Sequence, residues 1–132
     1  MSDYSKVNLL EIESSSKTEG LEMRFARKYL DSRDLGISLS RYAPNYEAKT
    51  AHSHVVQEEA YVVIRGSGHI MLNKKIVKIS LWDVIRVAPE VIRAFKAGPD
   101  GLDIIAVGGP KPDDGDGVRH DLSWPNEEDW TK

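Results

Sequence analysis

The feature that most constrains the fold of this chain is a succession of short extended segments between residues 21 and 108, with turn residues between them. Several segments alternate apolar and polar side chains with a period of two, which is typical of half-buried β-strands. The expected strands lie at residues 23–29, 37–41, 60–65, 69–72, 76–79, 83–87, 91–96 and 102–107. A helix is an alternative only at Met23–Leu30, where the residues tolerate either structure. The pattern therefore predicts an all-β sandwich or barrel.

Glycine, proline and asparagine mark the expected breaks between strands. A hairpin turn is expected at Asn73-Lys74-Lys75. Pro44-Asn45 is expected to end the extended run that includes residues 37–41. Gly66-Ser67-Gly68 is expected to interrupt one extended run, and Gly98-Pro99-Asp100-Gly101 to separate the last two.

A chain of 132 residues suits one domain with one hydrophobic core. Residues 1–20 are polar in composition and are expected to form a flexible leader before the barrel at residues 21–108. Residues 109–132 combine prolines, glycines and acidic residues and are expected to form an acidic tail. Trp124 and Trp130 predict that this tail packs on the barrel or on a partner chain, since exposed indoles seldom serve no purpose.

Charge and composition argue against several classes of partner. The net charge is −3 and the basic residues are scattered, so a nucleic-acid partner is not expected. No apolar stretch is long enough to span a bilayer and the start lacks a signal-peptide pattern, so we expect a cytoplasmic protein with no membrane partner. The chain has no cysteine, so any metal has to be held by nitrogen and oxygen ligands.

Two imidazoles and two carboxylates lie within eight residues, in His52-Ser53-His54 and Glu58-Glu59. An extended strand repeats its side-chain direction every two residues, so His52 and His54 can converge on one point. Imidazole with carboxylate suits divalent iron, zinc, manganese, nickel or copper. Glu59 is the expected carboxylate ligand, Glu58 faces the other way, and Gln57 could supply a further oxygen.

This motif resembles the first motif of the cupin superfamily: His52-x-His54, four residues, Glu59, six residues, Gly66. The resemblance spans roughly residues 35 to 108 and implies a jelly-roll barrel, also called a double-stranded β-helix. Tyr46 stands in place of the leading glycine of that motif. The second motif is similar in hydrophobic pattern but departs at three positions, which are Trp82, Glu90 and Arg93. Arg93 stands where the family places a fourth metal ligand, a histidine, and arginine does not ligate a divalent metal.

Arg93 leaves the state of the site open. It can pair with Glu59 in a two-pronged ion pair that occupies the place of a metal. Alternatively, it can anchor the carboxylate or phosphate of a ligand above the histidines. Tyr61 and Phe95 are expected on the inner faces of their strands, where they shape the cavity and are candidate ligand contacts.

We expect a cupin barrel whose cavity binds a small polar, acidic molecule, with Arg93, Tyr61 and Phe95 around the ligand. A divalent metal at His52, His54 and Glu59 is optional in this hypothesis. A metal enzyme is the first alternative, with Tyr61 or Glu58 available for proton transfer and dioxygenation or sugar-type isomerisation as the reactions that the resemblance implies. A scaffold protein with a vestigial metal site is the second. Exposed strand edges predict a homodimer.

Overall fold

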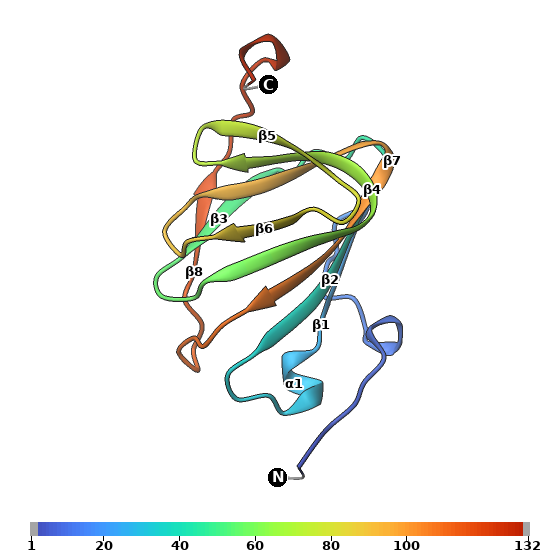
Figure 1. Cartoon of the computed structure of the whole chain (residues 1–132), viewed down its shortest axis with the longest axis vertical. Helices are drawn as coiled ribbons and strands as arrows, with labels where there is room; N and C mark the ends of the chain where they lie inside the picture. Colours follow the sequence, from blue (N-terminus) through green and yellow to red (C-terminus); the bar gives the residue numbers. More distant parts are fainter. Residues whose placement is uncertain (1–2, 131–132) are drawn as a thin grey trace.

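The chain folds into one curled antiparallel sheet with little helix (Figure 1). The computed structural model describes residues 3–130. The strands are β1 (Leu21–Phe25), β2 (Gly36–Tyr42), β3 (Thr50–His54), β4 (Glu59–Leu72), β5 (Lys75–Ser80), β6 (Val84–Val87), β7 (Arg93–Gly108) and β8 (Gly117–Asp121). Short helical turns are η1 (Leu9–Glu11), α1 (Arg27–Leu30) and η2 (Glu127–Asp129). The all-β barrel expected from the sequence is confirmed, and none of the helices within residues 3–130 is long enough to cross a membrane.

The strands pair in an order that differs from their order in the sequence, and four of them supply the hydrophobic core. One path through the sheet runs in the order β1, β2, β7, β3, β8, and β4 pairs with β5, β6 and β7. Apolar side chains from β4, β5, β6 and β7 form the buried core: Tyr61, Val63, Ile70, Ile79, Val87, Phe95, Ala97, Leu102 and Ile104. In the sheet, β3 lies between β7 and β8.

Two predicted breaks are wrong, because β4 and β7 each continue through their glycines. Gly66-Ser67-Gly68 lies inside β4, and Gly98-Pro99-Asp100-Gly101 lies inside β7. The two strands pair with each other on both sides of this region, with register shifts between Val63 and Arg65 and between Gly66 and Gly68. Bulges of this kind bend a strand without ending it. The sequence pattern marks the bend correctly but suggests a turn, because both structures need glycine.

Gly66 can be replaced only at a high cost. Its φ is +74°, and a Cβ atom there would lie 2.0 Å from the carbonyl oxygen of Gly101. Gly66→Ala is expected to lower the free energy of unfolding by about 2–4 kcal/mol, since it adds a backbone clash to the left-handed strain. Gly115→Ala is the matched control, because Gly115 has a φ of +83° and open space around it. Chemical denaturation of both variants measures the difference, and equal losses would show that the clash relaxes freely.

The segment before β1 lies against that strand. Ile12 is buried, the backbone N–H of Ser15 donates to the Met23 carbonyl oxygen at 2.8 Å, and Ser14 Oγ accepts from the Met23 N–H at 3.0 Å. β1 then ends at Phe25 and α1 follows, so the stretch Met23–Leu30 is part strand and part helix.

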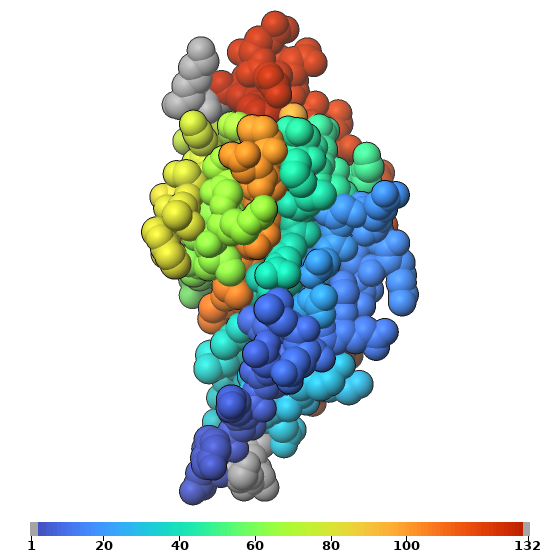
Figure 2. Space-filling model, turned by 90° about the vertical axis from the view of Figure 1, so that its right-hand side faces the viewer, coloured from blue at the N-terminus to red at the C-terminus, as the bar shows by residue number. Residues whose placement is uncertain are grey.

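The acidic tail adds a strand to the barrel. β8 pairs with β3, with Thr50 opposite Asp121 and His54 opposite Gly117. Trp124 Nε1 donates to the carbonyl oxygen of Ala48 at 3.0 Å, which holds the tail beyond β8 against the barrel. The C-terminal segment then lies at one end of the molecule and the N-terminal segment at the other (Figure 2).

Candidate functional site

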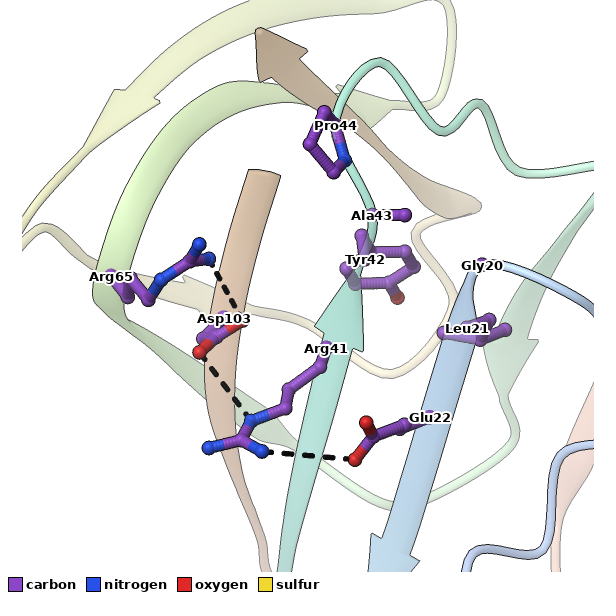
Figure 3. Close-up of a pocket in the computed structure, with 9 residues that line it drawn as sticks. All are labelled: Gly20, Leu21, Glu22, Arg41, Tyr42, Ala43, Pro44, Arg65 and Asp103. Atoms are coloured by element: carbon purple, nitrogen blue, oxygen red, sulfur yellow. Dashed lines mark ion pairs between the residues drawn. The ribbon is translucent and has the colours of Figure 1, made fainter. Parts of the chain in front are cut away.

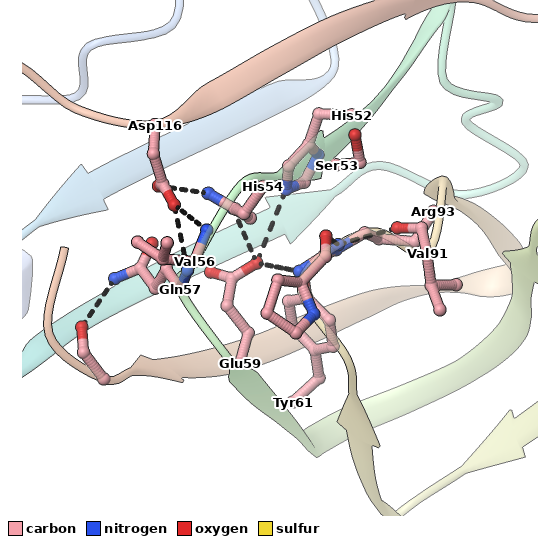
Figure 4. Close-up of polar contacts among 12 residues, drawn as sticks. His52, Ser53, His54, Val56, Gln57, Glu59, Tyr61, Val91, Arg93 and Asp116 are labelled. Carbon is pink, nitrogen blue, oxygen red and sulfur yellow. Dashed lines mark hydrogen bonds and ion pairs between the residues drawn. The ribbon is translucent and has the colours of Figure 1, made fainter. Parts of the chain in front are cut away.

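His52, His54 and Glu59 converge at the junction of β3 and β4 (Figure 4). One ligand atom from each residue lies within 4.8 Å of the other two. Nε2 of His54 is 3.1 Å from Glu59 Oε1, and Nε2 of His52 is 3.5 Å from the same oxygen. The two-residue spacing of the histidines puts both rings on the inner face of β3, as the sequence predicts. These three residues therefore form a candidate metal-binding group.

Asp116 holds the His54 ring from the other side. Its Oδ1 is 2.9 Å from His54 Nδ1, and its Oδ2 accepts from the N–H groups of Val56 at 2.7 Å and Gln57 at 2.8 Å. Burial raises the pKa of Asp116, but the Val56 N–H and the other hydrogen bonds outweigh it and lower the pKa to about 2. Asp116 is therefore a carboxylate at neutral pH, and it can accept a hydrogen bond from the Nδ1–H of His54.

Both ring nitrogens of His54 face carboxylate oxygens. Hydrogen bonding to Glu59 raises the pKa of His54, burial opposes this, and the bond to Asp116 adds to the increase. With no metal on Nε2, the two carboxylates favour the ring that carries a proton on each nitrogen, because carboxylates accept hydrogen bonds and do not donate them. With a metal on Nε2, the Asp116–His54 pair is the carboxylate–histidine arrangement that orients metal-ligating imidazoles.

Sequence reasoning missed Asp116. It lies 62 residues from His54, in the acidic stretch that was expected to be a tail. Nothing in its local sequence distinguishes it from Asp113 and Asp114 nearby. Only the pairing of β8 with β3 would have brought it to the histidines, and that pairing is not encoded by a local pattern.

Arg93 is the most deeply buried charged group of the site. Its side chain has 0% exposure, and its Nη2 donates to Glu59 Oε1 at 2.9 Å. Its Nε donates to the Tyr61 hydroxyl at 3.0 Å, and its Nη1 donates to the carbonyl oxygens of Pro89 and Val91 at 2.9 and 2.7 Å. The guanidinium thus reaches Glu59 through Nη2 alone, because Nε is bonded to Tyr61 and Nη1 to backbone carbonyls, so the two-pronged ion pair expected with Glu59 is not formed.

Glu59 Oε1 is a shared acceptor. It also accepts from the Tyr61 hydroxyl at 2.6 Å. Burial would raise the pKa of Glu59, but the hydrogen bonds from His52, His54 and Tyr61 hold it far below its usual range. Burial likewise raises the pKa of Tyr61, which stays a phenol. Glu59 is therefore a permanent anion that faces the cation of Arg93 on one side and the histidines on the other.

The donor set fits a divalent metal with three protein ligands. Two ligand atoms bound at near 2.1 Å lie about 3.0–3.4 Å apart, and the two histidine–Glu59 distances of 3.1 and 3.5 Å are close to this range. Asp116 fixes the ring of His54 with Nε2 toward Glu59. Arg93 contributes no ligand, so coordination positions would stay open for water or a bound molecule.

A cavity of about 1070 Å³ contains the site. It is lined by residues from α1 and from β1, β2, β3, β4, β7 and β8, and its apolar walls include Met23, Phe25, Tyr42, Tyr46 and Phe95. The charged residues that line it are Arg27, Lys28, Asp31, Lys49, Glu59, Arg93, Lys111, Asp116 and Arg119. Six of these are cationic and three are acidic, in a chain whose net charge is −3. The cavity therefore favours a negatively charged occupant.

Comparison with known proteins identifies the fold. No family model matches the chain, and no curated protein matches it. Among solved structures, a cupin protein from Bacteroides fragilis is 17% identical and has a TM-score of 0.70, with all of this chain and 98% of that chain covered. The chain has the cupin fold.

Two further solved structures that resemble this chain carry different activities in their names. The polyketide cyclase RemF from Streptomyces resistomycificus is 12% identical with a TM-score of 0.71, and the match covers 93% of this chain and 88% of that chain. Pac13, a nucleoside dehydratase, is 17% identical with a TM-score of 0.74, and the match covers 90% of this chain and 93% of that chain. At these identities the likeness concerns the fold of the cupin barrel and not its substrate.

The remaining candidate residues are not members of the candidate metal-binding group. Phe95 lines the cavity and packs edge-on against Tyr61, with 5.0 Å between ring centroids. Gln57 donates from Nε2 to the Gly109 carbonyl oxygen at 3.0 Å. Glu58 faces away from the cavity, as expected, and its Oε2 accepts from Arg86 Nη1 at 2.8 Å on the exposed surface.

A second pocket of the cupin barrel, of about 520 Å³, is lined by Arg41, Arg65, Asp103 and Glu22 among others (Figure 3). Arg41 Nε lies 3.5 Å from Asp103, Arg65 Nη1 lies 3.5 Å from the same carboxylate, and Arg41 Nη1 lies 3.8 Å from Glu22. The two cations and two anions offset one another, so this pocket lacks the cationic excess of the larger cavity.

Proposed function

We propose that this cupin binds a small acidic molecule in the cavity beside His52, His54 and Glu59, with a divalent metal as an optional partner of those residues. The observation that carries the proposal is the excess of cationic residues around the ligand set, in a chain that is acidic as a whole. A focused positive potential raises the local concentration of anions in a cleft.

Metal and anion would support each other at this site. Two neutral histidines, the Glu59 and Asp116 carboxylates and the Arg93 guanidinium sum to a charge of −1, so a divalent ion would leave the site with a charge of +1. An anionic ligand next to the ion offsets that charge. A bound metal would supply Lewis-acid polarisation of a ligand oxygen.

Arg93 supports the proposal through Glu59 and Tyr61. Its side chain has no exposed surface and makes four hydrogen bonds inside the protein, so it is not free to contact a ligand in this conformation. We assign it the role of holding the Glu59 carboxylate toward the histidines, while its charge adds to the cationic cavity. Tyr61 and Phe95 form part of the wall on which the ligand rests.

Thermal shifts test the proposal, and metal analysis separates it from a metal-dependent enzyme. The metal content of protein purified without chelator or nickel resin is compared with that of His52→Ala, in which two ligands remain of three. Succinate and phosphate are expected to raise the melting temperature of the wild type, and the increase should grow with the concentration of the anion. Lys78→Ala on β5, whose side chain is not part of the cavity wall, is the control. A melting temperature unchanged by either anion would count against the proposal.

A metal-dependent enzyme is the second candidate. The observation that favours it is the Asp116–His54 pair, which orients an imidazole in the manner of metalloenzyme ligands, together with the open coordination positions. Dioxygenation and sugar-type isomerisation stay expectations from the family resemblance, since RemF and Pac13 carry other activities in their names. Stoichiometric metal that disappears in His52→Ala would favour this candidate over a ligand-binding barrel. The homodimer and the cytoplasmic location stay predictions from the sequence.

A further inference from the structure

Arg119 lies on the inner face of the barrel, next to the candidate metal ligands. In β8 it stands directly opposite His52 of β3, and on the other side of His52 stands Arg93 of β7. Directly opposite residues on antiparallel strands project from the same face of the sheet. Arg93, His52 and Arg119 thus form one row across three strands, and all three line the cavity.

The two arginines of this row differ in what their guanidinium groups can do. Arg93 is buried and bonded inside the protein. Arg119 is exposed, and within residues 3–130 its side chain makes no hydrogen bond or ion pair. A guanidinium presents two parallel N–H donors that match a carboxylate. Arg119 therefore has this recognition surface free and turned to the cavity, one strand from the ligands.

An aromatic wall continues from the metal ligands into the same cavity. The Tyr61 hydroxyl binds Glu59 at 2.6 Å, and the Tyr61 ring packs on Phe95 with 5.0 Å between centroids. Phe95 lies 5.8 Å from Tyr42, which lies 5.7 Å from Tyr46. Rings arranged in this way offer edge and face contacts to a flat apolar molecule. A cavity of about 1070 Å³ also exceeds the need of a small dicarboxylate.

We propose that Arg119 anchors the carboxylate of an aromatic acid whose ring system packs on the wall formed by Phe95, Tyr42 and Tyr46. This rests on the proposed function, because it names the ligand class and the anchor of the same cavity. Arg119 then takes the place at the ligand that the sequence assigned to Arg93, and the tail strand β8 becomes part of the binding site.

Titration calorimetry with 2-naphthoate on the full chain, purified without chelator, tests the proposal. The wild type is expected to bind 2-naphthoate more tightly than the neutral 2-naphthalenemethanol and than succinate. Arg119→Gln is expected to weaken 2-naphthoate binding by about tenfold or more. Its affinity for 2-naphthoate should then equal its affinity for 2-naphthalenemethanol. Arg119→Lys is expected to fall between the two, since it keeps the charge and loses the fork. Arg86→Gln, which removes an arginine on the exposed face of β6, is the matched control and should bind as the wild type does.

The outcomes separate this inference from the proposed function. If Arg119→Gln binds 2-naphthoate as tightly as the wild type, the anchor lies elsewhere and the inference fails while anion binding stands. If succinate binds as tightly as 2-naphthoate, the aromatic class is wrong. If the wild type binds none of 2-naphthoate, succinate and phosphate, the proposed function fails and the inference fails with it.

Discussion

Replacing Arg93 by methionine is expected to lower the free energy of unfolding by about 3–5 kcal/mol. The Arg93 side chain has no exposed surface, and its loss leaves the largely buried carboxylate of Glu59 without its cation. The carbonyl oxygens of Pro89 and Val91 also lose their donors. Methionine keeps much of the apolar stem, so the loss reports on charge and hydrogen bonds more than on volume. Urea denaturation followed by circular dichroism measures it.

A double-mutant cycle isolates the ion pair between Arg93 and Glu59. In a Glu59→Gln background the same Arg93→Met change is expected to cost markedly less, because no buried anion is left behind. Arg86→Met is the matched control, since its partner Glu58 is exposed and such surface pairs contribute about 0–1 kcal/mol. An Arg93→Met variant as stable as the wild type, or an equal loss in both backgrounds, would show that Glu59 is stabilised by the histidines and Tyr61 alone.

The barrel and the ligand set could be predicted because both depend on short-range spacing. Alternation with a period of two identifies strands wherever one face is buried, and the same period places His52 and His54 on one face of β3. Glu59 follows from its position at the start of the next strand, where its parity with Tyr61 turns it inward. Local pattern therefore sufficed for residues that lie within ten positions of one another.

The rest of the site depends on contacts between distant segments. Asp116 and Arg119 reach the histidines only because β8 pairs with β3, and the composition of residues 109–132 indicates a tail rather than a strand. The breaks predicted inside β4 and β7 were wrong for the same reason. Glycines permit either a turn or a bend, and here the pairing of the two long strands with each other produces a bend. Burial of Arg93 was likewise decided by the partners around it, which a single sequence does not reveal.

Asp116→Asn is expected to weaken metal binding by about 10- to 100-fold, the range typical of lost carboxylate partners to metal-ligating histidines. The amide oxygen of an asparagine can still accept the hydrogen bonds from the N–H groups of Val56 and Gln57. Its amide N–H₂ then faces Nδ1 of His54, which has to accept instead of donate. The remaining ring proton is then held on Nε2, the nitrogen that points to Glu59 and that a metal needs. The dissociation constant for zinc, measured by competition with a chelator, gives the effect.

Histidine nitrogen chemical shifts of the metal-free protein report whether Nδ1 of His54 has lost its proton while Nε2 keeps its own. Asp113→Asn is the matched control, because it removes the same charge from the same acidic stretch, at an exposed position outside the cavity wall. Zinc affinity equal in Asp116→Asn and Asp113→Asn would mean that Asp116 contributes only through its charge. A loss of zinc affinity confined to Asp116→Asn, accompanied by loss of the Nδ1 proton, would establish the tail as the segment that orients the histidine of this site.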